Sequence, residues 1–101
     1  MNIYFSPLAE EKLIKLTKYL TENWSIKIKD EFLEKLKSKL LQISTHPETC
    51  PKSSFQNNLF KSIVTKQNTL YYRWLRDKAE IEIITIFDTR QHPNTLKRDL
   101  K

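Results

Sequence analysis

The sequence contains no glycine, a single cysteine and no long apolar run. Because glycine takes a positive φ most readily, turns of that kind must use asparagine or aspartate, and the candidates are Asn57-Asn58, Asn68 and Asp77. Cys50 cannot close an intrachain disulfide, and no neighbouring histidine or second thiolate would activate it or complete a metal site. We therefore expect a reduced, cytoplasmic protein in which Cys50 is inert.

Segments for membrane insertion or export are also lacking. No apolar run approaches the ~18 residues that span a bilayer. Residues 1–7 have neither the basic start nor the apolar core of a signal peptide. We expect neither export nor insertion into a membrane.

The chain carries more basic than acidic side chains. Its 101 residues fit a single domain over 1–101, and 18 Lys and Arg against 12 Asp and Glu give a net charge of +6. Every arginine lies in the second half of the sequence. A basic protein of this kind favours acidic partners such as nucleic acid, an acidic protein or anionic lipid, and charge alone does not choose among them.

The first half of the chain has helical periodicity. Residues 2–5 are β-prone, and Ser6-Pro7 is a strong helix start, which predicts a short strand followed by a helix over about 7–22. Its apolar positions recur every three or four residues and are Leu13, Leu16, Leu20 and Trp24.

A second helix is predicted from Ser25, which can cap it, to just before His46-Pro47. Its apolar stripe consists of Ile28, Phe32, Leu36, Leu40 and Ile43. Since only a few residues separate the two helices, we expect an antiparallel helical hairpin with one apolar face to bury.

The second half has strand periodicity. Three β-type runs over 59–65, 69–76 and 80–87 predict an antiparallel meander. In the middle run, Leu70, Tyr72 and Trp74 share one face and Tyr71, Arg73 and Leu75 the other. The run 81–87 loses its alternation, as a central strand covered on both faces does. The fold class is therefore α+β, with the order β-α-α-β-β-β.

This order of elements, with Asn23-Trp24, Leu70–Trp74 and Phe87–Pro93, resembles the RelE/ParE family of toxins over nearly the whole chain. The most specific part is Asp-Thr-Arg-Gln-His-Pro at 88–93, which follows the last strand where similar proteins place a functional arginine. The resemblance implies a cognate antitoxin as partner. It also implies one of two activities: inhibition of DNA gyrase by protein contact, or ribosome-dependent cleavage of mRNA. Neither requires a cofactor or a metal.

RNA cleavage would need a base, an acid and cations for the developing charge. The candidate catalytic residues are His92, Arg90 and Arg73, and the candidate phosphate-binding or target-binding residues are Arg90, Arg73, Lys61 and Lys66. His92 is the candidate proton-transfer group, because its reference pKa of about 6.5 lies near neutrality. Many RelE-like nucleases have a tyrosine near the C-terminus, whereas no tyrosine follows Phe87 here.

Each candidate also has a structural interpretation. Arg73 can form a cross-strand ion pair with Glu82, Arg90 can pair locally with Asp88, and His92 can be a solvated turn residue. The lysines of the second helix can simply form a solvated face or can hold an acidic antitoxin.

The ParE-like interpretation is preferred because the 88–93 signature occurs without a C-terminal tyrosine. The alternatives are a RelE-like ribonuclease and a non-toxic module that binds an antitoxin. In each case we expect a small hetero-oligomer in which a flexible antitoxin segment folds against the helical hairpin or a sheet edge.

Overall fold

The computed structural model describes residues 1–53 and 58–100. The elements are β1 (Asn2–Phe5), α1 (Pro7–Asn23), α2 (Ile26–Thr45), the 3-10 turn η1 (Pro47–Thr49), β2 (Leu59–Ile63), β3 (Asn68–Leu75), the 3-10 turn η2 (Arg76–Lys78), β4 (Glu80–Asp88) and α3 (Pro93–Asp99). The predicted α+β class and the order β-α-α-β-β-β are confirmed. Helix α3 is an addition that the sequence analysis missed.

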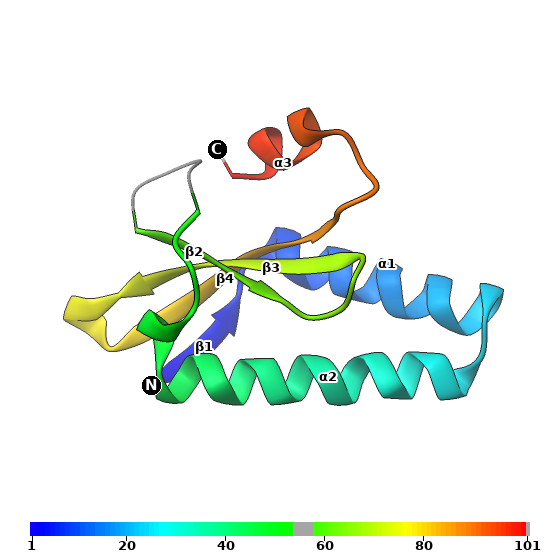
Figure 1. The fold of residues 1–101 in the computed structure, drawn as a ribbon, viewed down its shortest axis with the longest axis horizontal. Coiled ribbons are helices and arrows are strands. Elements are labelled where there is room, and N and C mark those ends of the chain that lie inside the picture. The colour runs from blue at the N-terminus through cyan, green and yellow to red at the C-terminus, as the bar shows by residue number, and fades with distance from the viewer. Residues whose placement is uncertain (54–57, 101) are drawn as a thin grey trace.

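The four strands form one sheet in the order β1-β4-β3-β2. The last three strands are antiparallel neighbours, as predicted, whereas β1 lies beside β4 and runs parallel to it, so the sheet is mixed. The chain reaches this parallel arrangement because the helical hairpin connects β1 at one edge of the sheet to β2 at the opposite edge (Figure 1).

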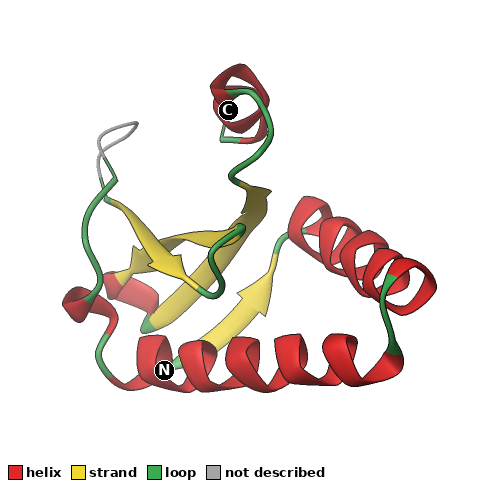
Figure 2. Cartoon of the chain, turned by 45° about the vertical axis from the view of Figure 1, so that its right-hand side comes forward, coloured by secondary structure: helices red, strands yellow, loops and turns green. Residues whose placement is uncertain are grey.

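The two faces of the sheet are covered by different helices. Helices α1 and α2 pack as an antiparallel hairpin on one face, and α3 lies over the other (Figure 2). The main core, between the hairpin and the sheet, contains Phe32, Leu36, Ile43, Leu70, Tyr72, Ile81 and Ile83. A smaller core under α3 contains Leu59, Tyr71, Ile84, Phe87, Leu96 and Leu100. The predicted two-sided burial of the last strand is confirmed.

A β-bulge in β4 accounts for its lost alternation. The partner of Tyr71 is Thr85, but the partner of Tyr72 is Ile83, so Ile84 is the extra residue. Ile86 consequently lies in the main core with Ile81 and Ile83, whereas unbroken alternation would place it on the opposite face with Ile84. Ser6 fixes this bulge, because its hydroxyl donates to the Ile84 carbonyl at 2.7 Å.

Helix termini follow the caps expected from the sequence. The Ser6 hydroxyl also accepts from the backbone N–H of Ala9, with Pro7 as the first residue of α1. The Ser25 hydroxyl accepts from the N–H of Ile28 at the start of α2, and α2 ends at Thr45, before His46-Pro47.

Two side chains that were predicted to face inward do not. Trp24 is 68% exposed because α1 ends at Asn23, so Trp24 is a non-helical C-cap residue that leaves the apolar stripe. Ile28 is 38% exposed, since it lies in the first turn of α2 at the tip of the hairpin. Phe32 and Tyr72 are buried as predicted.

Positive φ occurs at two described residues, Asn58 (58°) and Ala79 (52°). The prediction for Asn58 is confirmed, and Asn57 lies outside the described residues. The predictions for Asn68 and Asp77 were wrong. Asn68 begins β3, and the left-handed residue of the β3–β4 turn is Ala79 rather than Asp77. Because alanine has a Cβ, this left-handed conformation costs roughly 1–2 kcal/mol.

No helix within residues 1–53 and 58–100 is long and apolar enough to cross a membrane.

Candidate functional site

The segment after β4 is a tight turn built around Asp88. Its carboxylate accepts from the Arg90 backbone N–H at 2.9 Å, from Arg90 Nε at 3.0 Å and from an Arg90 terminal nitrogen at 2.8 Å. The Arg90 hydrogen bonds lower the pKa of Asp88, and Asp88 raises the pKa of Arg90. The local pair considered for Arg90 is therefore present, and it holds an arginine side chain that is 63% exposed in a defined orientation.

Thr89 joins this turn to the β2–β3 connection. Its backbone N–H donates to the Gln67 carbonyl at 2.8 Å, and its hydroxyl lies 3.3 Å from the Lys66 carbonyl. The fold thus brings Lys66 and Arg90, two of the predicted cations, to the same corner of the sheet.

Arg73 and Lys61 lie elsewhere on the sheet. Arg73 pairs in register with Glu82, while Asn68, five residues earlier on β3, pairs with Asp88. At about 3.3 Å per residue, Arg73 is roughly 17 Å from the Arg90 corner. Lys61 pairs with Tyr71, between these two points. The four predicted cations therefore do not converge on one phosphate.

His92 is used structurally. It is the N-cap of α3, where its Nδ1 accepts from the Asn94 backbone N–H at 3.1 Å and Pro93 is the first helical residue. In this role Nδ1 is an unprotonated acceptor, because a protonated nitrogen has no lone pair to offer. The Arg90 side chain turns back onto Asp88, so the described hydrogen bonds do not link it to His92.

Helix α3 forms one wall of a cleft whose other wall is α1, and the sequence analysis did not predict this cleft. Its C-terminal residue, Asp99, forms an ion pair with Lys12 of α1 and accepts from the Thr85 hydroxyl at 3.3 Å. Leu96 and Leu100 anchor the same helix in the smaller core. The sequence signal was present, since His92-Pro93 is a helix start and Leu96 and Leu100 are four residues apart.

Metal chemistry was not predicted for this chain. Among residues 1–53 and 58–100, no group of three or more His, Cys, Asp or Glu side chains is placed to hold a metal ion. The single cysteine is buried beside the main core, where its neighbours are mostly apolar.

Comparison with known protein families identifies the chain. The order β-α-α-β-β-β, with an arginine just after the last strand, is the feature on which the resemblance to RelE/ParE toxins was based, and the structure has both. The family model described as the ParE toxin of the type II toxin–antitoxin system parDE matches residues 3–93. The chain therefore belongs to the ParE toxin family, and the preference for ParE over RelE is confirmed. A comparison with curated proteins gave no match.

Family membership makes the chain a type II toxin, with an antitoxin as the partner that the family implies. The match ends at Pro93, the first residue of α3. The wall of the cleft that α3 provides thus lies beyond the matched residues.

Proposed function

We propose that this toxin inhibits DNA gyrase by direct contact and that a cognate antitoxin neutralises it. The main support for the proposal is the way Arg90 and His92 are placed in the 88–93 turn of a chain that belongs to the ParE family. Arg90 is locked by Asp88 and presented to solvent, while His92 caps a helix. An exposed arginine suits recognition of an acidic protein surface.

The spacing of the candidate residues supports contact over cleavage. Phosphodiester cleavage requires an acid, a base and cations within hydrogen-bond reach of one phosphate. Arg73 lies roughly 17 Å along the sheet from the Arg90 corner, a separation that suits two contacts with a large partner better than two contacts with one phosphate.

The surface also offers a place for an antitoxin. At the tip of the helical hairpin, Tyr19, Trp24 and Ile26 are 44%, 68% and 62% exposed. Aromatic and aliphatic side chains exposed together are typical of protein-binding surfaces. With a net charge of +6, the toxin would attract an acidic antitoxin segment, which would order itself on this surface.

The test is expression from a tightly controlled promoter without antitoxin, followed by pulse labelling of DNA, RNA and protein synthesis and by mapping of mRNA ends. We expect DNA synthesis to fail first while mRNA stays intact. Purified toxin should also inhibit gyrase supercoiling. Early translation arrest with new mRNA ends inside reading frames, abolished by His92→Gln, would instead identify a ribonuclease and overturn the proposal.

Variants of the turn separate contact from folding. Arg90→Glu should abolish toxicity, whereas Asp88→Asn, which frees Arg90 without removing it, should leave most toxicity in place. Lys37→Glu, the same charge change on the exposed face of α2, is the matched control. All variants are compared at equal expression and with unchanged circular dichroism. Full toxicity of Arg90→Glu would refute the assigned role.

A further inference from the structure

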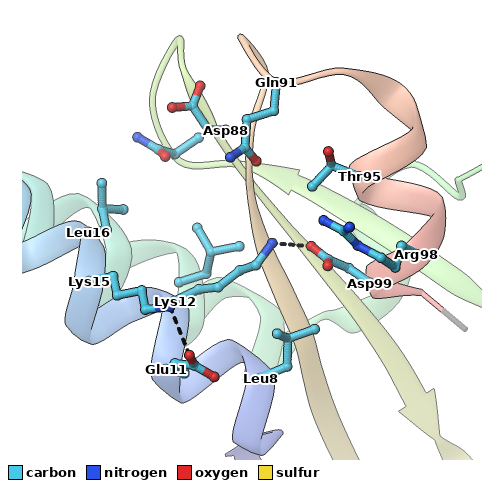
Figure 3. A pocket seen from close by; sticks show the side chains of 12 residues that line it. Leu8, Glu11, Lys12, Lys15, Leu16, Asp88, Gln91, Thr95, Arg98 and Asp99 are labelled. Atoms are coloured by element: carbon cyan, nitrogen blue, oxygen red, sulfur yellow. Dashed lines mark hydrogen bonds and ion pairs between the residues drawn. The ribbon is translucent and has the colours of Figure 1, made fainter.

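A cleft opens between α1 and α3, above the ends of β3 and β4 (Figure 3). Its volume is about 450 Å³, which falls within the range of roughly 300–1,000 Å³ for sites that bind small ligands. Leu8, Leu16 and Ile86 give it an apolar part, and charged side chains from α1 and α3 face each other across it.

The carboxylates of the cleft already have cationic partners. Asp99 is paired with Lys12, Glu11 with Lys15 at 2.9 Å, and Asp88 with Arg90, which lies just outside the lining. The pairing therefore uses every acidic side chain of the lining and both of its lysines.

Arg98 is the remaining cation of the lining, and it has no carboxylate partner among the described residues. It lines the cleft from α3, and Figure 3 shows its guanidinium group on the cleft side of the helix, next to Asp99. Its side chain forms no hydrogen bond or ion pair with any residue in the ranges 1–53 and 58–100. Four cations face three carboxylates in and beside the cleft, which therefore has one surplus positive charge. The cations are Lys12, Lys15, Arg98 and Arg90.

We propose that this cleft binds one carboxylate of an acidic side chain, carried by a peptide segment with apolar neighbours. Arg98 provides the planar fork that matches a carboxylate with two hydrogen bonds. The apolar part of the cleft holds the adjacent aliphatic side chain. A single carboxylate balances the one surplus charge, whereas a phosphate dianion would exceed it.

The site goes beyond the proposed inhibition of gyrase and does not depend on it. Its α3 wall, with Thr95, Arg98 and Asp99, follows the residues that match the ParE family model. The binding specificity would therefore be a property of this chain's C-terminal helix, while the toxin fold supplies the wall formed by α1.

The experiment is an NMR titration of the full ¹⁵N-labelled chain with the capped peptide acetyl-Leu-Glu-Leu-amide. Its control is acetyl-Leu-Gln-Leu-amide, which has the same shape without the charge. We expect saturable shifts of the Gln91, Thr95 and Arg98 amide signals, and binding of the glutamine peptide at least about tenfold weaker. Equal binding of the two peptides, or tighter binding of inorganic phosphate, would overturn the proposal.

Two neighbouring residues of α3 provide matched variants. Arg98→Gln should weaken binding of the glutamate peptide about tenfold or more. Lys97→Gln, which makes the same charge change on an exposed residue outside the cleft, should change it less than about twofold. An unchanged Leu96 signal shows that α3 remains docked in each variant. Equal effects of the two substitutions would mean that only net charge matters and would refute a site at Arg98.

Discussion

The hydroxyl of Tyr72 is the buried polar group whose removal has the clearest predicted cost. Tyr72 is 0% exposed in the middle of β3, and its hydroxyl donates to the Pro47 carbonyl at 2.7 Å. Its ring stacks on Phe60 with the centroids 5.3 Å apart. This one residue therefore joins the sheet to the turn that follows α2.

Tyr72→Phe keeps the ring and its stacking but removes the donor. The Pro47 carbonyl, in a fully buried residue, then loses its hydroxyl partner. A buried acceptor left unsatisfied costs about 1–3 kcal/mol. For a domain of this size, each 1 kcal/mol lowers Tm by about 4–8 °C. We therefore expect Tm to fall by roughly 4–24 °C.

Urea unfolding followed by circular dichroism measures this cost as a change in the midpoint at constant slope. Tyr71→Phe is the matched control. Tyr71 is the preceding residue on β3, is 7% exposed on the opposite face, and has no hydroxyl hydrogen bond to any residue in the described ranges. It should lose less than about 0.5 kcal/mol. Equal losses for the two variants would refute the role of the Tyr72–Pro47 hydrogen bond.

Alkaline pH tests the same hydroxyl through its ionisation. Burial, followed by the interaction with Cys50, raises the pKa of Tyr72 well above its usual value of 10.0. Above about pH 10 the native state keeps a proton that the unfolded chain loses, so ionisation destabilises the fold as the pH rises. The stability difference between wild type and Tyr72→Phe should therefore narrow above pH 10. A constant difference up to pH 12 would contradict this linkage.

Three further substitutions test other stabilising contacts of the fold by the same unfolding measurement. Ser6→Ala removes both the α1 cap and the hydrogen bond to the bulge, and should cost about 1–3 kcal/mol; a loss below about 0.5 kcal/mol would contradict it. Lys12→Met leaves the 7% exposed Asp99 carboxylate without its cation and should cost about 1–3 kcal/mol, recovered in part by adding Asp99→Asn. Arg90→Gln restores the lowered pKa of Asp88 toward its usual value. Its cost at pH 7 should be small because the pair faces solvent, and it should shrink further as the pH falls below about 4; a cost that grows with acid would refute this reasoning.

The core of the fold was predictable because apolar residues recur at regular spacings in the sequence. Apolar steps of three and four residues define the hairpin, and the alternation of Leu70, Tyr72 and Trp74 assigns one face of β3. Caps at Ser6 and Ser25 then fix where the helices start. These features depend on neighbours within a few residues, so the sequence alone reveals them.

Other features depend on contacts between distant parts of the chain. The position of β1 beside β4 is fixed by pairing across about eighty residues, and no local pattern encodes it. Trp24 continues the apolar period of α1, but the helix ends one residue earlier, and the side chain turns outward. The separation of Arg73 from Arg90 follows from strand register, which was not known until the sheet was aligned.

The family signature at 88–93 has a structural role that affects how its functional variants are interpreted. Asp88 holds Arg90, Thr89 binds the β2–β3 connection, and His92-Pro93 starts α3. A substitution here can thus reduce toxicity by releasing the turn or α3 without touching any target. Asp88→Asn releases the arginine but keeps its charge, while Arg90→Glu changes both. Only a loss of toxicity confined to the second variant, with α3 still docked, assigns Arg90 to the contact with the target.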